Sequence, residues 1–149
     1  MSDSNDGLSD ADQIEAVADQ LTASADQLHA SIMRAIKTSD GGDPDTARAL
    51  LDDELVLRQR ANSLYGDAAA FVVGKLGQSQ QHIIALTGAA NEQLAKIAAL
   101  ADAVSLVGAL LAFAGAVITR QPAPILAALE KIAHQVQSVK ADRSPTTAS

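Results

Sequence analysis

The three histidines, His29, His82 and His134, are the best candidates in this sequence for metal binding or for proton transfer near neutral pH. They fall on three different predicted helices, and no second ligand follows any of them three or four residues later. A helix needs that spacing to present two ligands on one side, as in the His-Glu-x-x-His motif. We therefore expect no metal site and no cofactor, and we interpret the histidines as surface or core-edge residues.

Two glycine-containing segments have a superficial likeness to ligand-binding loops. Seven residues separate Gly66 from Gly74, where a phosphate-binding loop has four, and Leu76 stands where that loop needs Ser or Thr. The segment 40–45 (DGGDPD) lacks the alternating oxygen ligands and the distal Glu of a calcium-binding EF loop. We interpret it as a turn in which Asp43 caps the next helix.

Neighbouring carboxylates that could act as an acid and a base occur at Asp52, Asp53 and Glu54. A carboxylic acid that donates protons near neutral pH needs a cleft that raises its pKa, and the sequence gives no sign of one. No Gly-x-Ser-x-Gly nucleophile motif is present either. We therefore predict that the protein is not an enzyme and has no small-molecule substrate.

Composition favours an all-α chain with one core. Hydrophobic residues make up 48% of the 149 residues, yet only Tyr65, Phe71 and Phe113 are aromatic, whereas β-sandwiches draw on aromatic and β-branched residues. The chain is long enough to bury a sizeable core. It contains no cysteine, which excludes a disulfide framework and a thiolate metal site.

Charge is distributed unevenly along the chain. Residues 1–53 contain twelve acidic and three basic residues, whereas residues 54–149 contain six and eight, so a balance of −9 and a balance of +2 give the net charge of −7. Because there is no basic run, we expect no nucleic-acid partner. The first thirteen residues are acidic and polar, which predicts that the chain has no cleavable signal peptide.

Apolar residues recur at helical spacing over most of the sequence. Ser9 is a weak N-cap for the first helix, and Asp43 followed by Pro44 is a clear start for the second. Gly74 and Gly77 mark either a turn or a bend. The expected helices lie near residues 9–38, 44–74, 78–119 and 124–140.

These helices are expected to form a single domain over residues 9–140. Its front half, 9–74, is acidic, and its rear part, 78–140, is an apolar helical hairpin. Residues 1–8 are predicted to be a disordered acidic lead, and residues 141–149 a disordered tail.

The third predicted helix has the most regular pattern. Its apolar and small residues alternate spacings of four and three over five heptads, which is typical of a coiled-coil seam. A single helix over 83–119 would be about 55 Å long, and it is expected to stop at Arg120, before Pro122 and Pro124. The seam consists of Ile83, Thr87, Ala90, Leu94, Ile97, Ala101, Val104, Gly108, Leu111, Gly115 and Ile118.

The segment Ile97–Thr119 carries the strongest functional signal. It contains one charged residue, Asp102, and as a helix it would span about 35 Å, against about 30 Å for the hydrocarbon core of a bilayer. Small residues recur at every fourth position, as in membrane helices that pack closely. However, no Trp or Tyr flanks the segment, and an Ala-rich core helix of a soluble bundle shows the same pattern.

Ten residues of this segment are expected to contact a membrane or a packing helix. The two glycines among them would let two helix backbones approach closely. The ten are Ala101, Val104, Ser105, Gly108, Leu110, Leu111, Ala112, Phe113, Gly115 and Ile118.

The predicted fold is therefore an all-α, elongated bundle of about four helices, with a long heptad-patterned third helix and a C-terminal helical hairpin. We expect a non-enzymatic protein that self-associates and engages a membrane through residues 97–119, in a pore-forming, translocator-like or assembly role. This general pattern is similar to that of helical pore-forming toxins and secretion translocators, although no residue motif ties the chain to such a family. The alternative is a soluble helix-bundle adaptor or chaperone with 97–119 as its buried core helix.

The expected partners follow from the same features. They are further copies of the chain or a helical protein, and a membrane. The expected location is a membrane, together with a soluble cytoplasmic pool.

Overall fold

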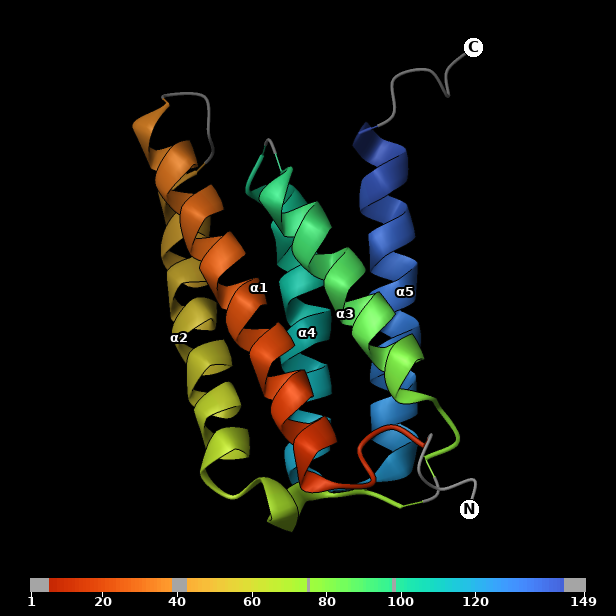
Figure 1. Cartoon of the computed structure of the whole chain (residues 1–149). Helices are drawn as coiled ribbons and strands as arrows, with labels where there is room; N and C mark the ends of the chain where they lie inside the picture. The colour runs from red at the N-terminus through yellow and green to blue at the C-terminus, as the bar shows by residue number, and fades with distance from the viewer. Residues whose placement is uncertain (1–5, 39–42, 75, 98, 144–149) are drawn as a thin grey trace.

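A computed structural model describes residues 6–38, 43–74, 76–97 and 99–143, and in this part of the chain the fold is all-helical, as predicted (Figure 1). It differs from the prediction in the number of helices, because there are five α-helices where about four were expected. A short 3-10 helix, η2, follows the second one. The elements are α1 (Ala11–Lys37), α2 (Pro44–Gly66), η2 (Ala68–Phe71), α3 (Gln80–Ala95), α4 (Ala101–Thr119) and α5 (Pro122–Arg143).

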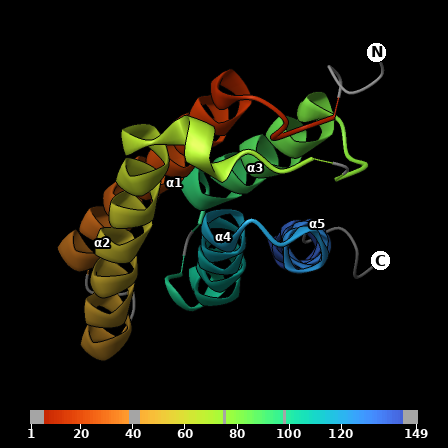
Figure 2. The same cartoon turned by 90° about the horizontal axis from the view of Figure 1, so that it is seen from below.

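The five helices form a closed ring of neighbours around one apolar core. α1 packs against α2 and α3, α4 packs against α2 and α5, and α3 closes the ring by packing against α5. Viewed along the bundle, α4 lies between α2 and α5 (Figure 2). Phe113 of α4 is the largest fully buried side chain of the core.

Side-chain caps fix where three of the helices begin. The Asp10 carboxylate accepts from the Gln13 N–H, the Asp43 carboxylate from Thr46, and the Ser79 hydroxyl from His82. Each cap satisfies one of the N–H groups that a helix leaves unpaired in its first turn. The first cap is Asp10 and not Ser9, so the predicted start was one residue early.

The second predicted helix is too long. α2 ends at Gly66, and after η2 the described residues between Val72 and Ser79 belong to no helix. Gly74 lies in this segment, and Gly77 has a φ of +79°, a left-handed conformation that suits glycine. The two glycines therefore belong to a connection between helices, not to a bend within one.

The N-terminal segment lies against this connection. The Asp6 carboxylate accepts from the backbone N–H groups of Leu76 and Gly77 at 3.0 and 2.9 Å, and Leu8 is fully buried. A Cβ on Gly7 would collide with the side chain of Ile83. The predicted disordered lead over 1–8 is thus wrong for Asp6, Gly7 and Leu8, while residues 1–5 lie outside the described residues.

The prediction of one long helix over 78–119 is also wrong. The chain turns after Ala95, and α4 begins only at Ala101. No glycine or proline lies between them, so the sequence contains no helix breaker there. The contacts of the turn with α1 account for the break.

Two residues of α1 cap the C-terminal end of α3. The Ser31 hydroxyl donates to the carbonyl of Leu94 at 2.6 Å, and Arg34 donates to the carbonyl of Ala95 at 3.0 Å. In the turn itself, Ile97 and Leu100 are buried in the core. These contacts satisfy the last carbonyls of α3 and replace the hydrogen bonds that a continuous helix would make.

Pro122 and Pro124 lie in the first turn of α5, which was expected to begin only near residue 124. Pro122 is the first residue of α5, a position where proline is tolerated because its missing N–H has no helical partner. The chain reverses at Arg120, which has a φ of +59°. At the other end, α5 continues to Arg143, so residues 141–143 of the predicted disordered tail are helical, and 144–149 lie outside the described residues.

We expect the Leu8→Ala substitution to lower the free energy of unfolding by about 2–4 kcal/mol, because it removes most of a fully buried leucine side chain. The measurement is urea denaturation followed by circular dichroism. The control is Leu55→Ala, since Leu55 is 57% exposed and should change stability by only about 0.5 kcal/mol or less. If both variants behave alike, the N-terminal segment does not contribute to the core.

A second prediction concerns the contact of α1 with α2 through Tyr65, whose hydroxyl donates to the Asp19 carboxylate. Burial, together with this hydrogen bond and the Asp19 charge, raises the pKa of Tyr65 above its ordinary value of 10.0. The contribution of the Tyr65 hydroxyl to the free energy of unfolding is therefore present below pH 10, and it is lost as the pH rises through the pKa of Tyr65 in the folded state.

Tyr65→Phe should cost about 0.5–1 kcal/mol near neutral pH, the usual net value of one hydrogen bond. The difference between the variant and the unsubstituted protein should shrink in urea titrations above pH 10. A difference that stays constant to high pH would contradict the role given to the phenol proton.

Candidate functional site

α4 has a buried side and an open side. The buried side packs mainly against α2 and α5, and no helix of the described part of the chain lies over the side that faces away from α3 (Figure 2). The buried residues of α4 are Ala103, Leu106, Val107, Ala109, Leu110, Phe113, Ala114, Ala116 and Val117.

The other residues along the helix, apart from the half-buried Asp102 in its first turn, form what we call the open face of α4. Val104 is the most exposed large residue on it, with 47% of its surface accessible. An ideal Cβ built on Gly108 meets no atom within 4 Å, so the space in front of this glycine is empty. The open face consists of Ala101, Val104, Ser105, Gly108, Leu111, Ala112, Gly115, Ile118 and Thr119, all of which are exposed or half-buried.

The ten residues predicted to contact a membrane or a partner helix lie on both sides of α4. Leu110 and Phe113 are fully buried in the bundle, and the other eight belong to the open face. The structure therefore brings eight of them together on one surface and places two in the core.

The break at 96–100 explains this division. The first part of the predicted seam, from Ile83 to Ile97, is buried as expected of a seam. Beyond the break, the same heptad line runs from Ala101 to Ile118 along the open face, because the turn changes the rotation of α4 relative to α3. A single helix over 78–119 would have kept one helical phase through residues 96–100 and would have placed the whole heptad line on one side.

The open face is uncharged over residues 103–119, and Arg60 of α2 lies beside it. Arg60 donates from its guanidinium to the carbonyl of Leu111 at 2.6 Å. A Cβ on Gly115 would lie 3.3 Å from that guanidinium, so the glycine leaves room for the arginine to reach the helix backbone. Gly108 and Gly115 therefore differ: the first is open, and the second is partly covered by Arg60.

A second group of polar side chains joins α1 to α2. The Glu54 carboxylate, which is nearly buried, lies 2.9 Å from Nδ1 of His29 and 2.8 Å from Nε of Arg58. Arg58 also pairs with Asp26 at 2.9 Å. The sequence indicated Glu54 as one of three neighbouring carboxylates, and its partners were not predicted. The Glu54–Arg58 spacing of four was the available signal, whereas the contact with His29 depends on the packing of α1 on α2.

This cluster is best described as a structural ion-pair network. The hydrogen bond to Glu54 is the main reason why the pKa of Arg58 lies above its ordinary value, and the hydrogen bond to Asp26 adds to it. Nearby, burial and the charge of Asp52 raise the pKa of Asp53. A buried carboxylate needs such partners to offset its loss of hydration, and Glu54 has two of them.

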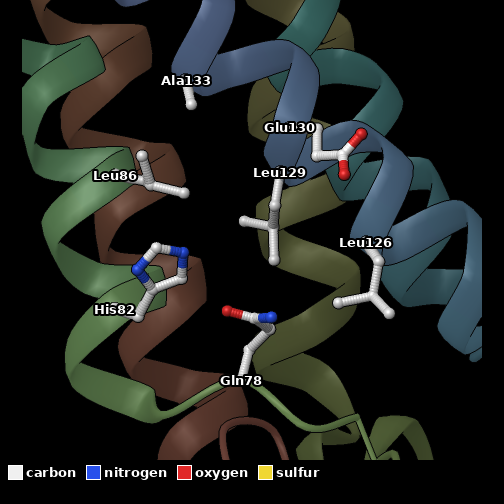
Figure 3. Close-up of a pocket in the computed structure, with 7 residues that line it drawn as sticks. All are labelled: Gln78, His82, Leu86, Leu126, Leu129, Glu130 and Ala133. Atoms are coloured by element: carbon white, nitrogen blue, oxygen red, sulfur yellow. The ribbon is translucent and has the colours of Figure 1, made fainter.

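A shallow groove lies between α3 and α5 (Figure 3). Its volume is about 220 Å³. The imidazole of His82 and the amide of Gln78 point into it, opposite Leu129 of α5. The sequence could not indicate this groove, because its two walls come from helices that are separated by α4. Its lining residues are Gln78, His82, Leu86, Leu126, Leu129, Glu130 and Ala133.

In the described part of the chain, α4 is the one helix long and apolar enough to cross a membrane, and half of it is buried inside the bundle. Core helices of soluble proteins meet the same criterion. Among the described residues, no three His, Asp or Glu side chains gather in a way that could hold a metal ion.

The chain was compared with protein-family models, with curated proteins and with solved structures, and none of the three comparisons gave a match.

The difference between the two glycines gives a test of the open face. At a protein concentration where the chain is monomeric, Gly108→Ala should raise the free energy of unfolding by about 0.5–1 kcal/mol, because alanine is the better helix former and its methyl group meets no atom. Gly115→Ala should raise it less, since Arg60 has to move. Urea denaturation compares the two variants. A loss of stability in Gly108→Ala would show that the space in front of residue 108 is filled.

Proposed function

We propose that this protein is a non-enzymatic helical protein that associates with a second copy of itself through the open face of α4, while α4 stays in the bundle. The observation that carries the proposal is the uncharged character of this face on a chain of net charge −7. On the neighbouring helix α5, by contrast, the charged residues Glu130 and Lys131 are exposed. An exposed apolar face bordered by polar residues is typical of a protein-protein contact.

The side chains of this face favour a second copy over an unrelated partner. Large apolar residues stand at 104, 111 and 118, and small ones stand at 101, 108 and 115, so both sets repeat every seven residues. Each set is the counterpart that the other needs in knobs-into-holes packing. A surface with both sets at one spacing is complementary to itself, as the interface of a symmetric dimer must be.

The buried side of α4 favours a helix that remains in the bundle. Leu106, Leu110, Phe113 and Val117 are fully buried. If α4 left the bundle to enter a bilayer, the apolar sides of α2 and α5 that it covers would be exposed to water, at a cost of about 1.5–3 kcal/mol for each large apolar side chain uncovered. Membrane insertion of α4 is therefore the alternative that the test has to exclude.

The test is a substitution on the open face with a matched control. Val104→Asp places a charge in the proposed contact and should weaken dimerisation at least tenfold, which corresponds to about 1.4 kcal/mol. Leu55→Asp, which also replaces an exposed apolar residue but on α2, should leave the dimer unchanged. Sedimentation velocity in buffer without detergent measures both variants and the unsubstituted protein.

Three results would overturn the proposal. The first is a protein that sediments as a monomer at all accessible concentrations. The second is an equal effect of both substitutions on the dimer. The third is flotation of the unsubstituted protein with liposomes in a form from which only detergent releases it, which would favour insertion of α4 into the membrane.

A further inference from the structure

We infer that the second copy packs antiparallel on the open face of α4, with Leu111 of each copy against Gly108 of the other. This inference rests on the proposed self-association and specifies its geometry. It follows from three features of the open face: the order of its large and small residues, the empty space in front of Gly108, and the charges at the two ends of α4.

The order of side chains distinguishes the two possible orientations. In a parallel pair, each position of the open face lies opposite the same position of the second copy. Gly108 would then face Gly108, and Leu111 would face Leu111. Glycine layers leave cavities, and a cavity costs about 24 cal/mol for each Å³. A parallel pair would therefore alternate empty and crowded layers.

An antiparallel pair places a large residue opposite a small one in every layer. When Gly108 of one copy lies level with Leu111 of the other, Val104 lies level with Gly115, and Ala101 with Ile118. The two-fold axis then passes between residues 109 and 110, and each of the three layers occurs twice. Such filling of small positions by large ones is what close packing requires.

The structure leaves room for the central layer. Apart from the backbone around Gly108 itself, no atom of the described residues lies within 4 Å of its Cβ position, and Leu111 is half-buried on the same face. Arg60 occupies the α2 edge of the face beside Gly115, so the outer layer at Val104 and Gly115 lies next to this arginine. Arg60 also donates to the Leu111 carbonyl and so borders the central layer on its α2 side, but it does not fill the space in front of Gly108.

The charges at the ends of α4 favour the same orientation. Asp102 lies in the first turn, and Arg120 caps the last one. An antiparallel pair brings Asp102 of one copy to the same end as Arg120 of the other, and it opposes the two helix dipoles. A parallel pair would bring like charges together at both ends.

The absence of cysteine from the sequence makes thiol cross-linking a direct test. Ala101→Cys and Ile118→Cys are prepared as separate single-thiol proteins, and each is checked by circular dichroism for an unchanged helical signal. Each protein alone, and a mixture in which subunits have exchanged, is treated with a short bismaleimide cross-linker and analysed on a denaturing gel. Ala30→Cys, at an exposed position of α1, is the control for random collision.

Antiparallel packing predicts a cross-linked dimer in the mixture and none above the control in either protein alone. In a dimer of Ala101→Cys alone, the two thiols would be about 25 Å apart along the helix axis, beyond the reach of the reagent. A cross-linked dimer with Ala101→Cys alone would indicate parallel packing, which overturns this inference but leaves self-association intact. A dimer in sedimentation that cross-links in none of the samples would also overturn it, whereas a protein that is always monomeric would overturn the proposed function itself.

Discussion

The arrangement of the rear half of the protein depends on the way α1 ends α3. Ser31 and Arg34 donate hydrogen bonds to the carbonyls of Leu94 and Ala95. These bonds make a turn possible in a segment that has neither glycine nor proline. The burial of Ile97 and Leu100 holds the turn in the core. The composition of the residues in α3 and α4 is that of one continuous helix, and these contacts are what separates the two helices.

The turn also decides which side of α4 reaches solvent. Because it changes the helical phase, the heavier side chains Leu106, Leu110 and Phe113 enter the core, and the heptad line with the glycines is left outside. The helix that meets the length and hydropathy criteria for a membrane span is therefore half core and half surface. The open face, and with it the proposed self-association, is a consequence of that rotation.

Polar contacts elsewhere set the relative positions of the other helices. The cluster around Glu54 joins α1 to α2, and the N-terminal residues Asp6 and Leu8 hold the connection that leads into α3. Net contributions of single hydrogen bonds are small, about 0.5–1.5 kcal/mol, and burial of the apolar core provides most of the stability. The role of these polar groups is to select one packing of helices whose apolar sides are made largely of similar Ala, Leu, Ile and Val residues.

The sequence by itself determined the helical class, the start of α2 at Asp43 and Pro44, and the apolar character of α4. These features depend on periodicity and on contacts between residues a few positions apart, which are visible in a linear chain. Eight of the ten residues predicted to have a packing role also share one surface, since a heptad line stays on one side of any straight helix.

Only the tertiary structure decided where the helices end and which line of α4 is exposed. The break after Ala95 depends on side chains of α1 more than sixty residues away. The positions of Asp6 and Leu8 depend on their hydrogen bonds to the connection after η2. The partners of Glu54 and the groove between α3 and α5 likewise require helices that are distant in sequence. Such contacts leave no local pattern in the sequence, because the same polar and apolar residue types also occur where no such contact is made.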